Sequence, residues 1–119
     1  MYYDLFNKIE NEVRKELHPN MDKLNELLKS SKKDIETATK YIDKVIEKKS
    51  TPYLEKLSFD DMMNYFCNTI KDIKKSSDDM LNKSLYSDDW VYVNAYITTR
   101  ICEFFKIYMT SITTLINNL

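Results

Sequence analysis

Glycine is absent from all 119 residues of this chain, and the chain contains only two prolines. Glycine is the usual residue where the backbone needs a positive φ, as in tight hairpin turns, phosphate-binding loops and strand bulges. Its absence excludes the glycine-rich loops that bind nucleotides and the nucleophile elbow of α/β-hydrolases. A fold of long helices with short connections fits this composition best.

Histidine and cysteine are almost as scarce, which limits the chemistry that side chains can perform. The chain has one histidine, His18, and two cysteines, Cys67 and Cys102. The cysteines are too far apart in sequence for a zinc-ligand pair, and no third group marks a Cys–His nucleophile. We interpret the cysteines as reduced thiols, with a disulfide between them as the alternative, and His18 as a solvent-facing residue of a connection. We therefore expect no catalytic residue, no cofactor and no enzyme activity.

Three pairs of adjacent aspartates are the only other candidates for a metal site. Each pair, 60–61, 78–79 and 88–89, follows a serine closely. Neighbouring side chains point about 100° apart on a helix, so one pair does not converge on one ion. Ser and Asp are also typical of helix N-termini, where they accept hydrogen bonds and complement the helix dipole. We therefore expect these pairs to cap helices and hold no metal.

The overall charge and hydrophobicity indicate a globular protein without a nucleic-acid partner. The formal net charge is −1 and the hydrophobic fraction is 43%. Binding to phosphates needs a basic excess or a basic stripe, and neither is present. The N-terminus lacks the basic and apolar regions of a signal peptide, so we expect a cytoplasmic protein. The length predicts a single domain over residues 1–119.

The composition also suggests where the gene comes from. Lysine, asparagine, isoleucine and tyrosine are frequent, whereas glycine, alanine, proline and arginine are rare. The frequent residues have AT-rich codons and the rare ones have GC-rich codons. We expect an AT-rich genome, such as that of a virus, a phage, a mobile element or an AT-rich bacterium.

Helical periodicity runs through the whole chain. In the first segment, Tyr2, Phe6, Ile9, Val13 and Leu17 recur every three or four residues, which predicts a helix over 2–17. The apolar residues of the next segment keep one phase through the Ser30–Ser31 pair. We therefore predict one helix over about 20–49, with a break at the two serines as the alternative.

Two further helices complete the predicted architecture. Ser50-Thr51-Pro52 is the clearest connection in the chain, and Ser58 with Asp61 forms a capping box that starts a helix over 59–86. Its phase continues through Ser76–Ser77. Ser87-Asp88-Asp89 starts a last helix over 88–118. The fold class is therefore all-α: an antiparallel up-and-down bundle of four helices, three of them long.

The last helix is apolar over most of its circumference, with Phe104 and Phe105 both on its apolar face. A membrane span is the alternative, and it is disfavoured because Arg100, Glu103 and Lys106 fall in the middle of the segment. Each would cost about 2.5–3.5 kcal/mol there. The narrow polar stripe of this helix contains Tyr92, Tyr96, Arg100 and Glu103. Tyrosine and arginine are typical of protein interfaces, so these four residues are the predicted partner-binding site.

These observations favour a non-catalytic helical protein that binds and modulates, most simply inhibits, another protein. One alternative is a structural homo-oligomer, for example a homodimer, that uses the C-terminal helix as its seam. Another alternative is a protein like the bacteriocin immunity proteins, by analogy of size and fold class alone.

Overall fold

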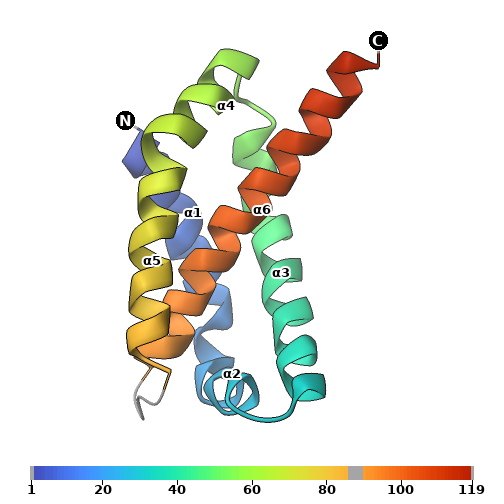
Figure 1. The fold of residues 1–119 in the computed structure, drawn as a ribbon. Helices are drawn as coiled ribbons and strands as arrows, with labels where there is room; N and C mark the ends of the chain where they lie inside the picture. The colour runs from blue at the N-terminus through green and yellow to red at the C-terminus, as the bar shows by residue number, and fades with distance from the viewer. Residues whose placement is uncertain (1, 86–89, 119) are drawn as a thin grey trace.

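The computed structural model describes residues 2–85 and 90–118, and every secondary-structure element in these ranges is helical (Figure 1). Three long elements form the bundle with the first helix, as predicted. α1 (Tyr2–Leu17) and α3 (Lys32–Leu54) are antiparallel. The chain then returns through α4 (Phe59–Tyr65), a π-helical segment (Phe66–Ile70) and α5 (Lys71–Lys83), and α6 (Val91–Asn117) runs back along α5. The predicted all-α bundle is confirmed.

The prediction of one helix over about 20–49 is right at its start but wrong in its middle and at its C-terminal end. A 3-10 turn (His18–Asn20) leads into α2 (Met21–Leu28), which ends before the serine pair, and α3 begins at Lys32. Ser31 has extended backbone angles, and its hydroxyl accepts a hydrogen bond from the Asp34 backbone N–H at 3.2 Å. Ser30 donates to the Asp34 carboxylate at 2.8 Å. These local hydrogen bonds replace those of a continuous helix, which is why the apolar phase alone was misleading.

The predicted connection at Ser50-Thr51-Pro52 is also wrong, because these residues lie inside α3. Pro52 stands in the last turn of the helix. The Thr51 hydroxyl donates to the Glu47 carbonyl at 2.7 Å, and the Glu55 N–H donates to the Thr51 carbonyl at 3.0 Å. Pro52 lacks the N–H that would bond one carbonyl of the preceding turn, but the hydrogen bond after it is made and the helix continues to Leu54.

The segment predicted as a helix over 59–86 is helical from Phe59 to Lys83. Its start is as predicted, since the Ser58 hydroxyl accepts the Asp61 N–H at 3.1 Å. Ser77 lies within α5 and is buried there. The helix ends at Lys83, where the Ser84 hydroxyl donates to the Met80 carbonyl at 2.6 Å. Asp78–Asp79 therefore lie inside a helix and do not cap one.

The last helix begins at Val91 and ends at Asn117, within the predicted range of 88–118. Its predicted cap, Ser87-Asp88-Asp89, lies outside the described residues. The N-terminal end of α6 is held by Trp90, whose indole N–H donates to the Asp22 carboxylate at 2.8 Å. Within residues 2–85 and 90–118, none of the helices combines the length and apolar character that a membrane span needs.

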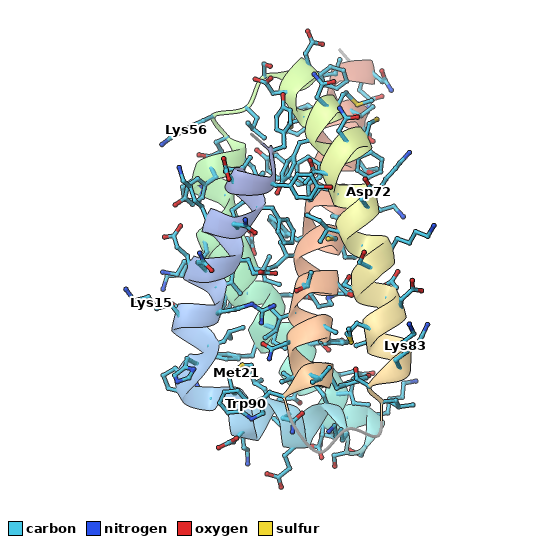
Figure 2. The ribbon with its side chains drawn as sticks, turned by 90° about the vertical axis from the view of Figure 1, so that its left-hand side faces the viewer. Lys15, Met21, Lys56, Asp72, Lys83 and Trp90 are labelled. Atoms are coloured by element: carbon cyan, nitrogen blue, oxygen red, sulfur yellow. The ribbon has the colours of Figure 1, made fainter. Side chains whose placement is uncertain are left out.

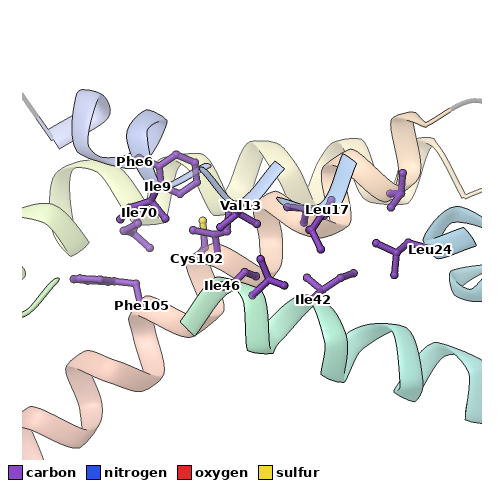
Figure 3. Close-up of a cluster of buried hydrophobic side chains, with 14 of the residues drawn as sticks. Phe6, Ile9, Val13, Leu17, Leu24, Ile42, Ile46, Ile70, Cys102 and Phe105 are labelled. Atoms are coloured by element: carbon purple, nitrogen blue, oxygen red, sulfur yellow. The ribbon is translucent and has the colours of Figure 1, made fainter. Parts of the chain in front are cut away.

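A single cluster of apolar side chains runs through the bundle (Figure 3). α1 contributes Phe6, Ile9, Val13 and Leu17, the residues whose spacing predicted that helix. Further buried residues from the other elements are Leu24, Ile42, Ile46, Tyr65, Ile70, Ile101, Cys102 and Phe105. Phe105 is buried while Phe104 is only partly buried against the cluster, so the α6 core face is narrower than predicted.

Candidate functional site

Two of the four residues of the predicted α6 stripe, Tyr96 and Arg100, contact α3, whereas Glu103 lies in electrostatic reach of Lys74 on α5. Tyr92, Tyr96, Arg100 and Glu103 are all half-buried. The Tyr92 and Tyr96 rings stack, with their centroids 6.3 Å apart and their planes 20° apart. The Tyr96 hydroxyl shares a hydrogen bond of 2.6 Å with the Thr39 hydroxyl of α3. The Tyr96 hydroxyl and the stacked faces of the two rings are therefore already engaged in contacts within the molecule.

Arg100 is also engaged with α3. Its guanidinium donates to both carboxylate oxygens of Asp43, at 2.9 and 2.7 Å. These hydrogen bonds raise the pKa of Arg100 above its ordinary value. A bidentate contact of this kind fixes the side chain in one geometry. The sequence placed these stripe residues on one face, but only the structure reveals Thr39 and Asp43 as their partners. That this stripe also binds another protein stays a prediction.

The contacts between the stripe and α3 explain how the bundle is arranged. Thr39 pairs with Tyr96 and Asp43 with Arg100, so α3 and α6 run in the same direction. α1 and α5 run in the opposite direction to both. In an up-and-down bundle, two parallel helices are diagonal to each other. α3 and α6 form one diagonal pair and contact each other. The helices of the second diagonal pair, α1 and α5, are therefore held apart.

A groove of about 610 Å³ lies between α1 and α5, with α6 as its floor. Figure 2 looks toward this side of the molecule, where α6 is visible between α1 and α5. Small residues hollow it out, namely Ala95 on the floor and Ser76 and Ser77 on the α5 wall. Larger apolar residues, Tyr3 and Met80, border it and are about half exposed. Apolar side chains thus lie along both walls of an open groove.

A polar network centred on Arg14 joins the α1 wall of the groove to its floor. Its guanidinium donates to the Asn94 side-chain oxygen, to the Asn94 carbonyl at 3.1 Å and to the Thr98 hydroxyl at 2.9 Å. Glu10 pairs with Arg14 at 3.4 Å and accepts the Thr98 hydroxyl at 2.9 Å. The network ties α1 to α6 in one register and neutralises both charges. Of the charged lining residues, Asp72 alone stands outside it.

The sequence analysis missed this groove. Ala95 and the serines lie on helix faces that look polar or neutral, and nothing in their local pattern shows that they meet. The usable signal was size, because Ala95 is a small residue in a helix otherwise rich in large ones. Recognising it required knowing that α5 and α6 are neighbours.

A second uncovered surface lies on the C-terminal part of α6. This part diverges from α4 and α5 as it approaches the C-terminus (Figure 1). Ile107 is 54% exposed and Leu115 is 61% exposed. The helix contains no charged residue from Ile107 to its end. Such a stretch contrasts with the chain as a whole, of which 31% is charged.

The groups with possible catalytic chemistry lie apart from both surfaces or are buried. Cys67 is exposed, whereas Cys102 is buried, and burial raises the pKa of the Cys102 thiol to about 12. His18 is exposed and packs edge-on against Trp90. Across residues 2–85 and 90–118, no three His, Cys, Asp or Glu side chains are grouped as metal ligands.

The described geometry is therefore that of a helical scaffold with two uncovered apolar surfaces. Comparison of the chain with known protein families, curated proteins and solved structures finds no match.

Proposed function

We propose that this protein is non-catalytic and binds another protein, which it modulates, by accepting an amphipathic helix of that partner in the groove between α1 and α5. The observation that carries this proposal is the open apolar groove over α6. Burying an apolar helix face in such a groove is a common mode of protein recognition. The small floor residue Ala95 permits a close approach of the partner backbone.

The charges of the groove define the chemistry of the partner helix. Glu10 and Arg14 neutralise each other, whereas Asp72 forms no ion pair with the described residues. A helix with apolar residues at positions i, i+3, i+4 and i+7 and a lysine or arginine beside Asp72 complements this surface. An acidic residue at the same place would be repelled, so Asp72 contributes to selectivity.

The predicted stripe is the second surface of this proposal. Tyr92, Tyr96, Arg100 and Glu103 retain partial exposure, and residues of these types are enriched at interfaces. The hydroxyl of Tyr96 and the guanidinium of Arg100 already have partners in α3. The groove is therefore the better-supported surface. Inhibition, a cytoplasmic location and an origin in a virus, phage, mobile element or AT-rich bacterium remain parts of the proposal that rest on the sequence alone.

A groove-filling variant tests the proposal. A library of helical peptides with the pattern above is selected for binding to the wild-type protein, and each selected peptide is titrated against Ala95→Leu. The added side chain fills the floor, so we expect at least about a tenfold loss of affinity, equivalent to 1.4 kcal/mol. Thr37→Leu, on an exposed position of α3, is the matched control and should bind as the wild type does. Equal binding by all three proteins would reject the groove.

A second experiment separates the groove from the stripe. Cross-linking in the native host identifies the partner, and its affinity is then measured for Ala95→Leu and for Tyr92→Ala with Tyr96→Ala. Loss of affinity in the first variant alone supports the groove. Loss in the folded tyrosine variant alone supports the predicted stripe instead.

A homo-oligomer is the second candidate, because one observation favours it specifically. The exposed apolar residues at the C-terminal part of α6 lie on the helix that was predicted to form the seam.

A further inference from the structure

The uncovered C-terminal part of α6 has a regular apolar ridge. Ile107, Ser111 and Leu115 are spaced four residues apart, so successive side chains turn by only about 40° around the helix axis. Ile107 and Leu115 are more than half exposed, and Ser111 is exposed between them. Phe104 and Tyr108, which are half-buried, flank the ridge. Two large apolar side chains therefore stand on either side of a small one.

This ridge has the geometry for packing against an identical ridge. When rows of residues four apart interdigitate, two helices cross at one of the preferred angles for helix packing. A small residue at the crossing point lets the two backbones come close. In an antiparallel crossing centred on Ser111, Ile107 of one copy lies opposite Leu115 of the other. The opposed helix dipoles favour this orientation.

The charge pattern identifies the occupant. A specific interface with a different protein usually carries complementary charges, which steer the encounter and exclude wrong partners. The helix from Ile107 to Asn117 has no charged residue of its own, so the ridge itself brings no like charges together. Beside Ile107, α3 carries two lysines and two acidic residues, whose charges balance. A helix that lies on a membrane surface is typically rich in lysine and arginine on its polar face, whereas here the polar residues are serine, threonine and asparagine.

We infer that a second copy of this chain covers the C-terminal part of α6, in an antiparallel crossing of the two helices at Ser111. This inference deepens the homo-oligomer candidate and is independent of the groove, which lies on the opposite part of the molecule along α6. The resulting dimer has a two-fold axis through the crossing point, and each contact occurs twice.

Sedimentation equilibrium over a hundredfold concentration range tests the inference. We expect the wild-type mass to rise from the 14.3 kDa of one chain toward twice that value. Leu115→Glu places a carboxylate in the apolar seam, and we expect the dissociation constant to rise by a factor of about 10 or more. Thr110→Glu, at an exposed position off the ridge, is the matched control and should dimerise as the wild type does.

A charge-pair rescue tests the antiparallel register. Ile107→Lys alone should also weaken the dimer, because it places an ammonium in the apolar seam. The double variant Ile107→Lys with Leu115→Glu should recover dimerisation, since each new lysine faces a new glutamate of the other copy. The two positions are too far apart on one helix to pair within a chain. Circular dichroism confirms that each variant is folded.

Three results would overturn the inference. They are a wild-type protein that is monomeric at every concentration, single variants that still dimerise, and a double variant that stays monomeric. Binding of the wild type to phosphatidylcholine vesicles, lost in Leu115→Glu, would assign the ridge to lipid instead. Peptide binding at the groove should be the same in all ridge variants, so failure of the dimer leaves the groove proposal standing.

Discussion

The two sides of α6 differ in how they meet the rest of the bundle. On the α3 side, polar residues close the contact, through the Tyr96–Thr39 hydrogen bond and the Arg100–Asp43 pair. On the side of α1 and α5, Ala95 and small wall residues leave a groove. We call the α3 side of α6 the closed side and the side of α1 and α5 the open side. The contacts of the closed side bring α3 and α6 together across the bundle, and this keeps α1 and α5 apart and leaves the groove. Polar residues on a helix can thus form the contacts between helices, while the proposed binding surface lies where side chains are small.

The largest expected effect comes from removing the core on which both sides rest. Phe105→Ala should lower the free energy of unfolding by about 3–5 kcal/mol, because it deletes a buried ring and leaves a cavity. Phe104→Ala is the matched control at the neighbouring position, which is only partly buried. It should cost about 1–2 kcal/mol. Urea unfolding measures both, and equal losses would contradict the burial described here.

The closed side should respond strongly to loss of its tyrosines. Tyr92→Ala with Tyr96→Ala removes two stacked rings and the hydrogen bond to Thr39, and we expect a loss of about 2–4 kcal/mol. Tyr3→Ala, on the border of the open side, should cost less than about 1 kcal/mol because its ring is half exposed. Thermal unfolding measures both. Wild-type stability in the double variant would mean that the stripe is free surface.

The ion pair of the closed side should contribute less. Arg100→Lys keeps the charge but loses the bidentate geometry with Asp43, so we expect a loss of about 0.5–1 kcal/mol. A double-mutant cycle of Arg100→Met, Asp43→Asn and their double variant removes the pair from either side and isolates its coupling energy. The coupling energy should shrink in high salt, because the pair is partly exposed. A coupling near zero at low salt would show that the pair does not close this side.

The smallest effect is expected on the open side. Ala95 is 7% exposed but lines the groove, so the longer side chain in Ala95→Leu has the groove to extend into. The free energy of unfolding should therefore change by no more than about 0.5 kcal/mol. The comparable change in the core, Ala38→Leu, overpacks a buried position of α3 and should cost about 1–3 kcal/mol. Unfolding of both variants in urea compares the two alanines. A similar loss in Ala95→Leu would mean that the groove is too narrow to accept a helix.

Local signals predicted the start and end of α1 and the start of α4 correctly. The first depends on a regular apolar spacing, and the second on the Ser58 cap, whose hydrogen bond is made within four residues. Local signals failed at Ser31 and Pro52. At Ser31, the continuous apolar period favours one helix, whereas serine capping favours a break. At Pro52, proline favours the end of a helix, whereas the surrounding residues favour its continuation. The balance between these tendencies depends on what the neighbouring residues pack against.

The site shows the same limit more sharply. The sequence grouped Tyr92, Tyr96 and Arg100 on one face because helical periodicity alone determines that grouping. It did not show that Thr39 and Asp43 lie opposite them, since those residues are more than fifty positions away in the chain. Whether a polar stripe contacts a neighbouring helix or stays exposed depends on which helix covers it.

The sequence by itself determined that this protein is helical, because the apolar period and the absence of glycine act over a few residues at a time. Only the tertiary structure decided that α6 meets α3 across the bundle, that α1 and α5 stand apart and that the end of α6 lies uncovered. These features depend on contacts between distant segments, and such contacts are set by the packing of the whole chain rather than by any local pattern.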